Sequence, residues 1–377
     1  MKSDIPVVAV NAHLASQASS YRSAGISGYI VKLVQHLPLD DEVRYLVLTG
    51  TETLIAELQL PTHRPAWSTA RPFARILWEQ LGVPWVLRRA QVHLLHAPAF
   101  GGPILSGVPH VDTVHDLSFL RYPSFFPKKK RLYLRWLTRL SCRRAAAVIA
   151  VSQFTAQEVI RLLGVPASRV HVIYHGVEPR FRPLPDEKVR RFRQQQRLPE
   201  RFILYLGTLE PRKNLITLVR AYAGLADPDL HLVLAGGKGW LYEDVFAEVE
   251  RLGVGARVHV PGYVPDAALP LWYNAADVFA YLSWYEGFGL PVLEALACGV
   301  PTVASQAASL PEVAGDAALL APPDDVSAVR ETLRRALEDE TLRARLRSAG
   351  PTRAAQFTWE ATAEQTVQVY KSILGVR

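Results

Sequence analysis

ILYLGTLEPRKNLITLVRAY, residues 203–222, gives the clearest indication of the fold class. An apolar run ends at Gly207, a short polar turn follows, and apolar residues then return at helical spacing from Asn214 onward. Strands that are apolar along their whole length and alternate with helices are typical of parallel sheets covered on both faces. The stretch therefore predicts one strand–turn–helix unit of a doubly wound α/β domain.

The same alternation runs through the whole chain. A first series of strand-like runs precedes residue 153, and a second series starts after residue 200. Between the two series, residues 179–200 are rich in Pro and Arg and contain no core-forming strand, so we expect a linker there. The sequence predicts an α/β protein with two doubly wound, Rossmann-like domains that face each other across a cleft. The runs of the first series are 5–10, 43–48, 92–96, 110–114 and 146–152.

Composition excludes several classes of protein. The chain has 377 residues, of which 49% are hydrophobic and 21% charged, so it is neither a disordered chain nor a fibre. Its two cysteines, Cys142 and Cys298, lie far apart and predict neither a disulfide framework nor a cysteine zinc site. No apolar run approaches the ~20 residues that span a bilayer, and the N-terminal run is too short for a secretion signal. We expect a cytoplasmic protein.

Charge is unevenly divided along the chain. Residues 1–182 carry 22 Lys and Arg against 11 Asp and Glu, whereas residues 183–377 carry 21 against 24. A basic half joined to a slightly acidic half suggests domains with different partners. Nucleic acid, anionic lipid and a phosphorylated substrate all remain possible partners of the basic half on charge alone.

Two cations mark the first candidate site. Arg212 and Lys213 stand side by side where the predicted helix starts, and free backbone N–H groups and the helix dipole already favour an anion there. The pair suits a pyrophosphate. The alternative is two solvated charges in an exposed turn.

SWYEGFGLPVLEALACGVPTVAS, residues 283–305, holds the second candidate site. Gly287 and Gly289 allow close approach of the backbone to a ligand, and Pro291 fits the first turn of a helix. Glu286 then lies on the loop and Glu294 on the first turns of that helix, so that both carboxylates could face one cleft. The alternative is a strand–loop–helix unit with two surface acids.

Together these motifs resemble the donor-binding half of glycosyltransferase family 4, whose members are retaining enzymes of the GT-B fold. The resemblance covers essentially the whole chain, and RILWEQLGVPWVLRRAQVHLLHAP (75–98) resembles the mannosyltransferase-like branch. It implies an N-terminal acceptor-binding domain (1–178), a C-terminal donor-binding domain (201–359) and a last helix (360–377) that crosses back onto the first domain. The other motifs that carry it are AGISGYI (24–30), VHDLSFLRYPSFF (114–126), AVIAVSQFTAQEVI (147–160), VIYHGVEPRF (172–181), LVLAGGKGW (232–240) and VPGYVPDAALPLWYNAADVF (260–279).

The resemblance also implies roles for individual residues in the second domain. Arg212 and Lys213 would bind the donor pyrophosphate, Glu294 the ribose hydroxyls, and Glu286 the hydroxyls of the transferred sugar. Tyr263 and Val264 would lie against the nucleobase. The remaining donor-binding groups would be Gly207 and the main chain of Phe288, Gly289 and Leu290.

In the first domain the implied catalytic residue is His115, which would reach the sugar. Gly25 and Gly28 would form the loop that faces the acceptor and the phosphates. His115 could instead cap its strand or bond to Asp116, and His175 is as readily a loop-stabilising residue as a ligand.

The implied mechanism is front-face substitution with retention, in which the leaving phosphate helps to deprotonate the acceptor hydroxyl. No carboxylate nucleophile for a double displacement is identifiable, since Asp112 and Asp116 are equally explicable as strand-end residues. Asp227-Pro-Asp229 reads as a solvated turn rather than a metal site. We expect no cofactor and no catalytic metal, because Arg212 and Lys213 would supply the positive charge.

A basic segment, residues 128–146, has two interpretations. Arg131, Arg135, Arg139 and Arg143 recur every four residues and form a charged helical stripe beside an apolar one of Leu132, Trp136 and Leu140. For the apolar stripe we favour packing on the sheet. For the arginines we favour attraction to anionic lipid or another polyanion, which would bring the enzyme to a lipid-linked acceptor.

The sequence therefore predicts a peripheral, cytoplasmic glycosyltransferase of polysaccharide biosynthesis that acts at the inner face of the membrane. It would transfer a hexose, for which our first choice is mannose from GDP-mannose, to a glycan or lipid-linked sugar. Alternatives are a UDP-sugar-dependent transferase of the same fold that moves glucose or N-acetylglucosamine, an epimerase or phosphorylase on that fold, and a non-enzymatic sugar- or polyanion-binding protein. We expect no nucleic-acid partner, because no recognised motif accompanies the charge.

Overall fold

The computed structural model describes residues 5–15, 25–51, 54, 56, 60–65, 67, 72–99, 101–123, 128–239 and 242–376. The chain divides into two compact units. Among the described residues, unit 1 consists of those up to Gly176 together with those from Trp359 onward, and unit 2 consists of those in Val177–Thr358. No helix among these described residues is long and apolar enough to cross a membrane.

Unit 1 is built on a parallel sheet of seven strands in the order β3-β2-β1-β4-β5-β6-β7. The central strands β1, β4, β5 and β6 are buried along nearly their whole length, as apolar runs between two layers of helices require. The strands are β1 (Val7–Asn11), β2 (Arg44–Leu48), β3 (Thr62–His63), β4 (Leu94–Ala97), β5 (His110–Val114), β6 (Ala147–Ala150) and β7 (Val170–Val172).

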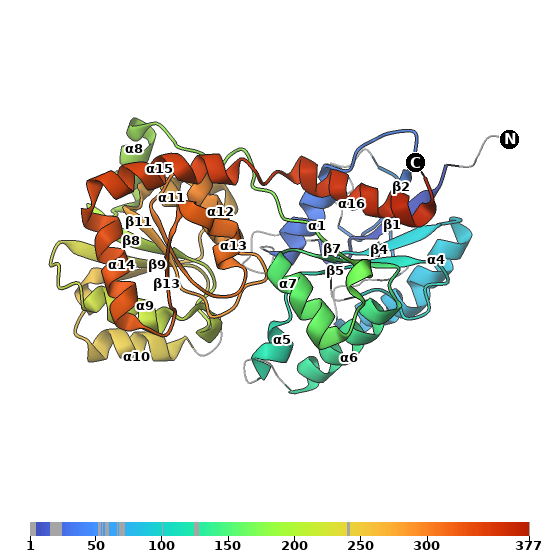
Figure 1. The fold of residues 1–377 in the computed structure, drawn as a ribbon, viewed down its shortest axis with the longest axis horizontal. Coiled ribbons are helices and arrows are strands. Elements are labelled where there is room, and N and C mark those ends of the chain that lie inside the picture. Colours follow the sequence, from blue (N-terminus) through green and yellow to red (C-terminus); the bar gives the residue numbers. More distant parts are fainter. Residues whose placement is uncertain are drawn as a thin grey trace. The chain divides into compact units, whose positions relative to one another are not determined.

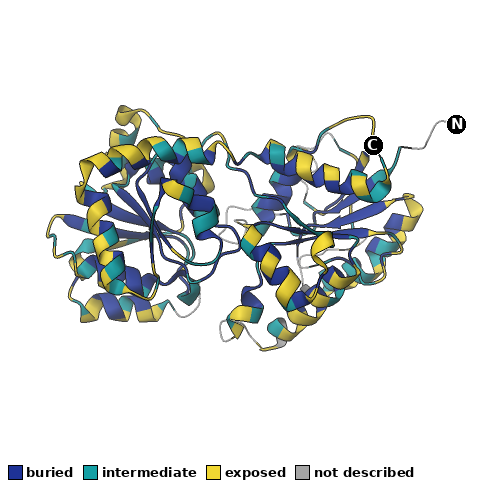
Figure 2. Ribbon diagram, in the orientation of Figure 1, coloured by how far each residue is buried: buried dark blue, intermediate teal, exposed yellow. Residues whose placement is uncertain are grey.

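Helices cover both faces of this sheet, with buried inner sides and exposed outer sides (Figure 2). The last helix, α16 (Trp359–Leu374), lies beside α1 in unit 1 and shares a core with it that includes Tyr29, Trp359 and Tyr370 (Figure 1). The other helices are α1 (Ile26–Gln35), α3 (Pro72–Leu77), the π-helix η1 (Trp78–Gly82), α4 (Val83–Arg89), α5 (Ser118–Arg121), α6 (Lys128–Arg144), α7 (Gln153–Glu158), the π-helix η3 (Val159–Leu163) and the 3₁₀ helix η4 (Ala167–Arg169).

Unit 2 has a parallel sheet of six strands in the order β10-β9-β8-β11-β12-β13. Chain order in this sheet is therefore 3-2-1-4-5-6, the arrangement of a doubly wound dinucleotide-binding fold. Both sheets confirm the predicted fold class. The strands are β8 (Arg201–Leu206), β9 (Leu230–Ala235), β10 (Val258–Gly262), β11 (Val278–Tyr281), β12 (Thr302–Ser305) and β13 (Leu319–Ala321).

The helices of unit 2 include one inside the segment expected to be a linker. Residues 179–200 contain α8 (Asp186–Gln196), and Phe192 of this helix is buried edge-on against Trp272, so the segment packs as part of unit 2. The others are η5 (Pro211–Lys213), α9 (Leu215–Ala223), α10 (Glu243–Arg251), η6 (Gly255–Arg257), η7 (Asp266–Ala268), α11 (Leu269–Ala275), α12 (Leu290–Ala297), α13 (Leu310–Ala314), η8 (Gly315–Ala317), α14 (Val326–Glu338) and α15 (Glu340–Ala354).

The basic segment forms α6, and its apolar stripe does not pack as expected. Leu132 is 67% exposed and Trp136 61% exposed, while Leu140 is half-buried. The side of α6 that faces the core carries Leu134 and Leu137 instead. The expectation that the Leu132–Trp136 stripe packs on the sheet was therefore wrong.

Candidate active site

The candidate site of unit 2 lies where its strand order reverses. β8 and β11 are neighbours, and the chain leaves them in opposite directions across the sheet, so their carboxyl ends form the topological switch point at which such sheets bind ligands. The turn after β8 and the loop after β11 meet there, because the Trp284 N–H donates to the Arg212 carbonyl at 3.0 Å. Both sequence motifs are thus brought to one point.

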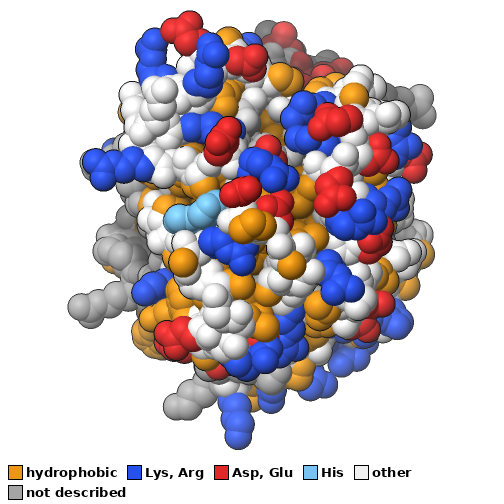
Figure 3. Space-filling view, turned by 90° about the vertical axis from the view of Figure 1, so that its left-hand side faces the viewer, with side chains coloured by type: hydrophobic (Ala, Val, Ile, Leu, Met, Phe, Trp, Pro, Cys, Tyr) orange, Lys and Arg blue, Asp and Glu red, His pale blue; other side chains and the backbone are white. Residues whose placement is uncertain are grey.

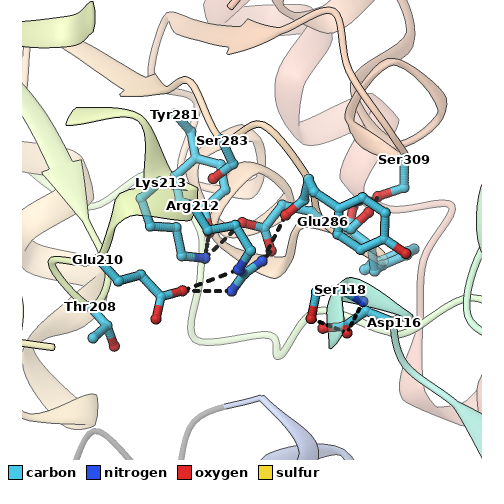
Figure 4. A network of polar contacts seen from close by, with 12 residues as sticks. Asp116, Ser118, Thr208, Glu210, Arg212, Lys213, Tyr281, Ser283, Glu286 and Ser309 are labelled. Carbon is cyan, nitrogen blue, oxygen red and sulfur yellow. Dashed lines mark hydrogen bonds and ion pairs between the residues drawn. The ribbon is translucent and has the colours of Figure 1, made fainter. Parts of the chain in front are cut away.

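A buried ionic network fills this point (Figure 4). Lys213 Nζ donates to Glu286 Oε1 and to the Tyr281 hydroxyl, each at 2.7 Å. Arg212 Nη1 lies 3.0 Å from Glu286 Oε2, so the two cations bind different oxygens of one carboxylate. The sequence motifs predicted these three charged residues but not the hydroxyl of Tyr281, whose place at the end of an apolar strand carries no signal of its own.

Arg212 is held from a second side as well. Its Nε and Nη2 donate to Glu210 Oε1 at 3.1 and 2.9 Å, and Nη1 donates to the Tyr285 carbonyl at 2.7 Å. Our sequence analysis missed Glu210, although it lies two residues before Arg212 in the quoted segment 203–222. Arg212 and Lys213 lie on η5, and Asn214, with φ of 57°, separates this turn from α9. The cations therefore belong to a 3₁₀ turn before the helix rather than to its first turn.

The electrostatics of the network keep Glu286 ionised. Burial alone would raise the pKa of Glu286, but Arg212 and Lys213 outweigh it and lower the pKa to about 2. Burial, followed by the charge of Arg212, lowers the pKa of Lys213, and Glu286 and Glu210 oppose this shift. Two carboxylates thus fix two cations in position, which is the preorganisation that stabilisation of a charged group requires.

Two glycines shape the backbone around the network. Gly207 follows β8 with φ of 150°, and a Cβ there would lie 2.7 Å from the Tyr205 hydroxyl oxygen. Gly289 precedes α12 with φ of 106°, and a Cβ there would lie 2.4 Å from Leu310. The 286–289 loop is also fixed by Ser309, whose hydroxyl contacts the carbonyls of Glu286 and Phe288 at 2.9 and 2.8 Å. Backbone at Phe288, Gly289 and Leu290 therefore runs in a constrained path into the helix.

Glu294 lies on α12, as the motif predicts, and its environment differs from that of Glu286. The Tyr273 hydroxyl, which the sequence analysis did not single out, donates to Glu294 Oε2 at 2.7 Å. Burial raises the pKa of Glu294 to about 8, so this carboxyl holds a proton at neutral pH while Glu286 does not. Tyr263 is partly exposed and Val264 buried, and both follow the edge strand β10.

His115, the candidate catalytic residue of unit 1, is a neutral imidazole. His115 follows β5, and its Nε2 lies 2.8 Å from the Pro98 carbonyl. A carbonyl only accepts, so Nε2 carries the proton and Nδ1 is left as an acceptor. Burial lowers the pKa of His115 to about 4, and its ring packs against Tyr29 and His175 at 4.7 and 5.5 Å between centroids.

The remaining candidates of unit 1 have local structural contacts. Gly25, with φ of 73°, is the N-cap residue of α1, and Gly28 lies inside that helix. Asp116 Oδ1 accepts from the Ser118 N–H at 2.9 Å and from its hydroxyl at 2.6 Å (Figure 4). Asp112 Oδ1 accepts from the Gly102 N–H at 3.1 Å. Asp116 therefore stabilises the turn that follows β5, whereas Asp112, in the middle of β5, holds the loop at Gly102.

Asp227-Pro-Asp229 is a turn, as predicted. Asp227 pairs with Arg201 at 3.0 Å and accepts from the Asp229 N–H at 3.0 Å. Within the described part of the chain, no group of three or more His, Cys, Asp or Glu is arranged to hold a metal ion.

Solved structures share this architecture over nearly the whole chain. HepE from Anabaena, crystallised with UDP and glucose, superposes with a TM-score of 0.76 at 22% identity, over 98% of this chain and all of that one. Sucrose-phosphate synthase from Thermosynechococcus elongatus gives 0.77 at 23% identity, over 99% of this chain and all of that one. The fold is therefore that of GT-B glycosyltransferases.

Sequence comparisons define the family. Residues 186–353 match the model "Glycosyl transferases group 1", and residues 23–181 match "Glycosyltransferase Family 4". An O-antigen chain mannosyltransferase B of Escherichia coli is 33% identical over 95% of this chain and 98% of its own length. Alpha-D-kanosaminyltransferase of Streptomyces kanamyceticus is 26% identical over 78% of this chain and 83% of its own length. The chain belongs to glycosyltransferase family 4, and the predicted enzyme class is confirmed.

Proposed function

We propose that this glycosyltransferase moves mannose from GDP-mannose to a glycan or lipid-linked sugar, with retention of the anomeric configuration. The observation that carries the proposal is the Arg212–Lys213–Glu286 network at the switch point of unit 2, in a chain that is 33% identical to an O-antigen mannosyltransferase over 95% of its length. The network supplies fixed positive charge for a pyrophosphate and a carboxylate for sugar hydroxyls.

Donor binding falls to residues 201–359 in this proposal. Arg212 and Lys213 bind the pyrophosphate and stabilise the leaving diphosphate, in place of a divalent metal. Glu286 accepts hydrogen bonds from the transferred sugar, and its low pKa supports that role because the carboxylate stays ionised. Glu294 binds the ribose hydroxyls. The base lies against Tyr263 and Val264, and Gly207 and the Phe288–Leu290 main chain complete the donor site.

Acceptor binding falls to residues 1–178. Gly25 and Gly28 lie on the loop and helix start that face acceptor and phosphates. His115 supplies Nδ1 as an acceptor for a sugar hydroxyl, a role supported by the hydrogen bond that commits Nε2 to Pro98. We place the enzyme in the cytoplasm at the inner face of the membrane, with the basic segment 128–146 towards the lipid.

Donor choice is tested by measuring transfer from GDP-mannose, UDP-glucose and UDP-N-acetylglucosamine to a mannose-terminated acceptor. We expect product from GDP-mannose alone. Product from a UDP-sugar alone would replace the mannosyl proposal with the UDP-sugar alternative. Binding of oligosaccharide without turnover of any donor would favour the non-enzymatic binding protein.

The same reaction tests retention and metal independence. We expect an α-linkage in the product, as in the donor, which one-bond C–H coupling in the NMR spectrum identifies. Activity should persist in excess chelator because Arg212 and Lys213 provide the charge. A β-linked product would contradict front-face substitution, and loss of activity that Mg²⁺ or Mn²⁺ restores would contradict the metal-free site.

A further inference from the structure

The helical segment α3–η1–α4, residues 72–89, is apolar on both of its sides. Trp78, Val83 and Leu87 are buried in a core cluster of unit 1. On the opposite side, exposed apolar residues recur every four positions: Phe73 (78% exposed), Leu77 (41%), Leu81 (63%) and Trp85 (57%). A helix at the surface of a globular protein normally presents polar residues there. This solvent-facing apolar stripe is therefore unexplained by the fold.

The exposed side of α6 has the same character. Leu132 and Trp136 lie one turn apart and are both more than half exposed, while the core-facing side is filled by other residues. Between them and around them the helix presents Arg135 and Arg139, which are also exposed. Exposed leucine and tryptophan among arginines are typical of helices that lie in a membrane interface.

A loop joins the two segments into one surface. The Ile104 N–H donates to Gln80 Oε1 of η1 at 3.0 Å, and Arg144 of α6 donates to the Ile104 carbonyl at 3.3 Å. Leu105, next to this bridge, is 77% exposed. Tyr133 of α6 is partly exposed as well. Burial raises the pKa of Tyr133, and the nearby charge of Glu79 on η1 raises it further. α3–η1–α4, this loop and α6 are thus neighbours.

Most of the exposed large hydrophobic side chains of the described residues belong to these neighbouring segments. Eight of the twelve lie on them, so the grouping is not the scatter expected of a monomer's surface. We call it the apolar–basic surface and define it by these eight: Phe73, Leu77, Leu81, Trp85, Leu105, Leu132, Tyr133 and Trp136.

The charge of the surface selects its partner. Residues 72–89 and 128–144 together hold eleven Lys and Arg and a single acid, Glu79. Unit 2 differs, since Lys and Arg alternate with Asp and Glu over the face in Figure 3. A second copy of the chain on the apolar–basic surface would bring two rows of arginines together, which like-charge repulsion disfavours. Anionic lipid headgroups above hydrocarbon complement both the cations and the apolar side chains.

We propose that the apolar–basic surface docks unit 1 on an anionic bilayer, with Phe73, Leu81, Trp85 and Trp136 inserted at the level of the headgroups and first acyl carbons. Arginines beside them contact lipid phosphates, and their stems extend over the apolar residues. This goes beyond charge attraction through 128–146, because insertion by α3–η1–α4 supplies a hydrophobic contribution that salt does not screen. It does not depend on which sugar the enzyme transfers.

The test is co-sedimentation of the full chain with vesicles of phosphatidylglycerol and phosphatidylethanolamine, compared with vesicles of phosphatidylcholine. We expect binding to the first and weak binding to the second. Leu81→Ser/Trp85→Ser should lower partition into anionic vesicles at least about tenfold, since two interfacial anchors are lost. Leu39→Ser is the matched control: Leu39 is 65% exposed in unit 1 outside the apolar–basic surface, and its loss should change nothing.

Three outcomes would overturn the proposal. The wild type could remain in the supernatant with anionic vesicles. Wild type and Leu81→Ser/Trp85→Ser could bind equally and be released equally by salt, which would leave charge alone as the cause. The wild type could be a dimer in sedimentation equilibrium that this variant dissociates, without binding vesicles, which would assign the surface to a second copy. Transfer to a water-soluble acceptor stays unchanged in the variant, so failure here is distinct from failure of mannosyl transfer.

Discussion

The two units share one topology and use opposite chemistry at corresponding places. In unit 2 the strand order reverses between β8 and β11, and charged side chains locked in ion pairs follow these strands. In unit 1 the strand order reverses between β1 and β4. The residues that follow the strands of this unit include His13 and His115, and burial lowers the pKa of each to about 4. In both units the fold brings side chains together at the carboxyl ends of the strands. Burial and the neighbouring charges determine which of these side chains are ionised.

This difference matches what each unit is proposed to bind. A diphosphate needs fixed cations, which are most effective where water is excluded. An acceptor hydroxyl needs hydrogen-bond acceptors, and an imidazole that stays neutral at pH 7 provides one. Substitutions in each unit should therefore have different effects on donor binding and on transfer.

The largest expected effect comes from removing a cation from unit 2. Lys213→Met should lower kcat/KM by at least about 10²-fold, because the leaving diphosphate loses a fixed charge and Glu286 loses one of its two cationic partners. Steady-state transfer kinetics measure it. Arg201→Met, which breaks the Asp227 pair of the same unit, is the control and should leave transfer unchanged. Equal losses in both variants would mean that the network is only structural.

In unit 1 the corresponding change is His115→Ala. We expect transfer to fall by about fivefold, which corresponds to the loss of one hydrogen bond of about 1 kcal/mol, with nucleoside diphosphate affinity unchanged. Isothermal titration separates the two quantities. A large loss of diphosphate affinity would show that His115 belongs to the donor chemistry of unit 2 and that the division between units is wrong.

Acid should separate the stabilities of the two units. Folded His115 and His96 have pKa values of about 4 and 3, below the unfolded value near 6.5, so the stability they contribute is lost as pH falls from about 6.5. Glu286, with a folded pKa of about 2, loses its contribution only below about pH 4.5, and protonated Glu294 gains stability as pH falls from 8. Between about pH 6.5 and pH 5 unit 1 should weaken while unit 2 does not.

Hydrogen exchange read by mass spectrometry for each unit checks this. Protection in the strands of unit 1 should decrease over that pH range after correction for intrinsic rates, and protection in the unit 2 strands should not. Parallel loss in both units would contradict the assignment of charge states.

A smaller effect is expected from Glu294→Gln. Because Glu294 is protonated at neutral pH in the free protein, the neutral amide should cost little stability. Binding of ribose hydroxyls favours the ionised form, so wild-type affinity for GDP should rise between about pH 7 and pH 9, whereas the variant's should stay flat. Titration calorimetry at several pH values measures the affinity of both proteins for GDP. A wild-type affinity that does not change with pH would contradict the assignment of Glu294 to the ribose site.

The sequence predicted the strands of both sheets that are long and apolar, and the place of the motifs on them. It missed β3, which has two residues, and β7, which has three half-buried ones, because such short edge strands leave no hydrophobic pattern. It also missed α8, since a single buried residue, Phe192, anchors a helix that is otherwise polar.

For the candidate site of unit 2, the sequence predicted the charged residues but not which of them pair with each other. Arg212, Lys213 and Glu286 are named by their motifs, but nothing in the spacing says that both cations bind one carboxylate. Nor does it indicate that Tyr281 and Tyr273 complete the hydrogen bonds of Glu286 and Glu294, because tyrosine in a buried strand or helix usually reflects packing. The opposite pKa shifts of the two glutamates depend on these tertiary contacts.

A donor site at the switch point of unit 2 can be tested by thermal unfolding with GDP, UDP or ADP in large excess, for wild type and Lys213→Met. A ligand at a hundred times its Kd stabilises by about 2.7 kcal/mol, which shifts the Tm by a few degrees. We predict a shift with GDP for the wild type and none for the variant. An equal GDP shift in Lys213→Met, or no shift with any diphosphate, would contradict a donor site at the switch point of unit 2.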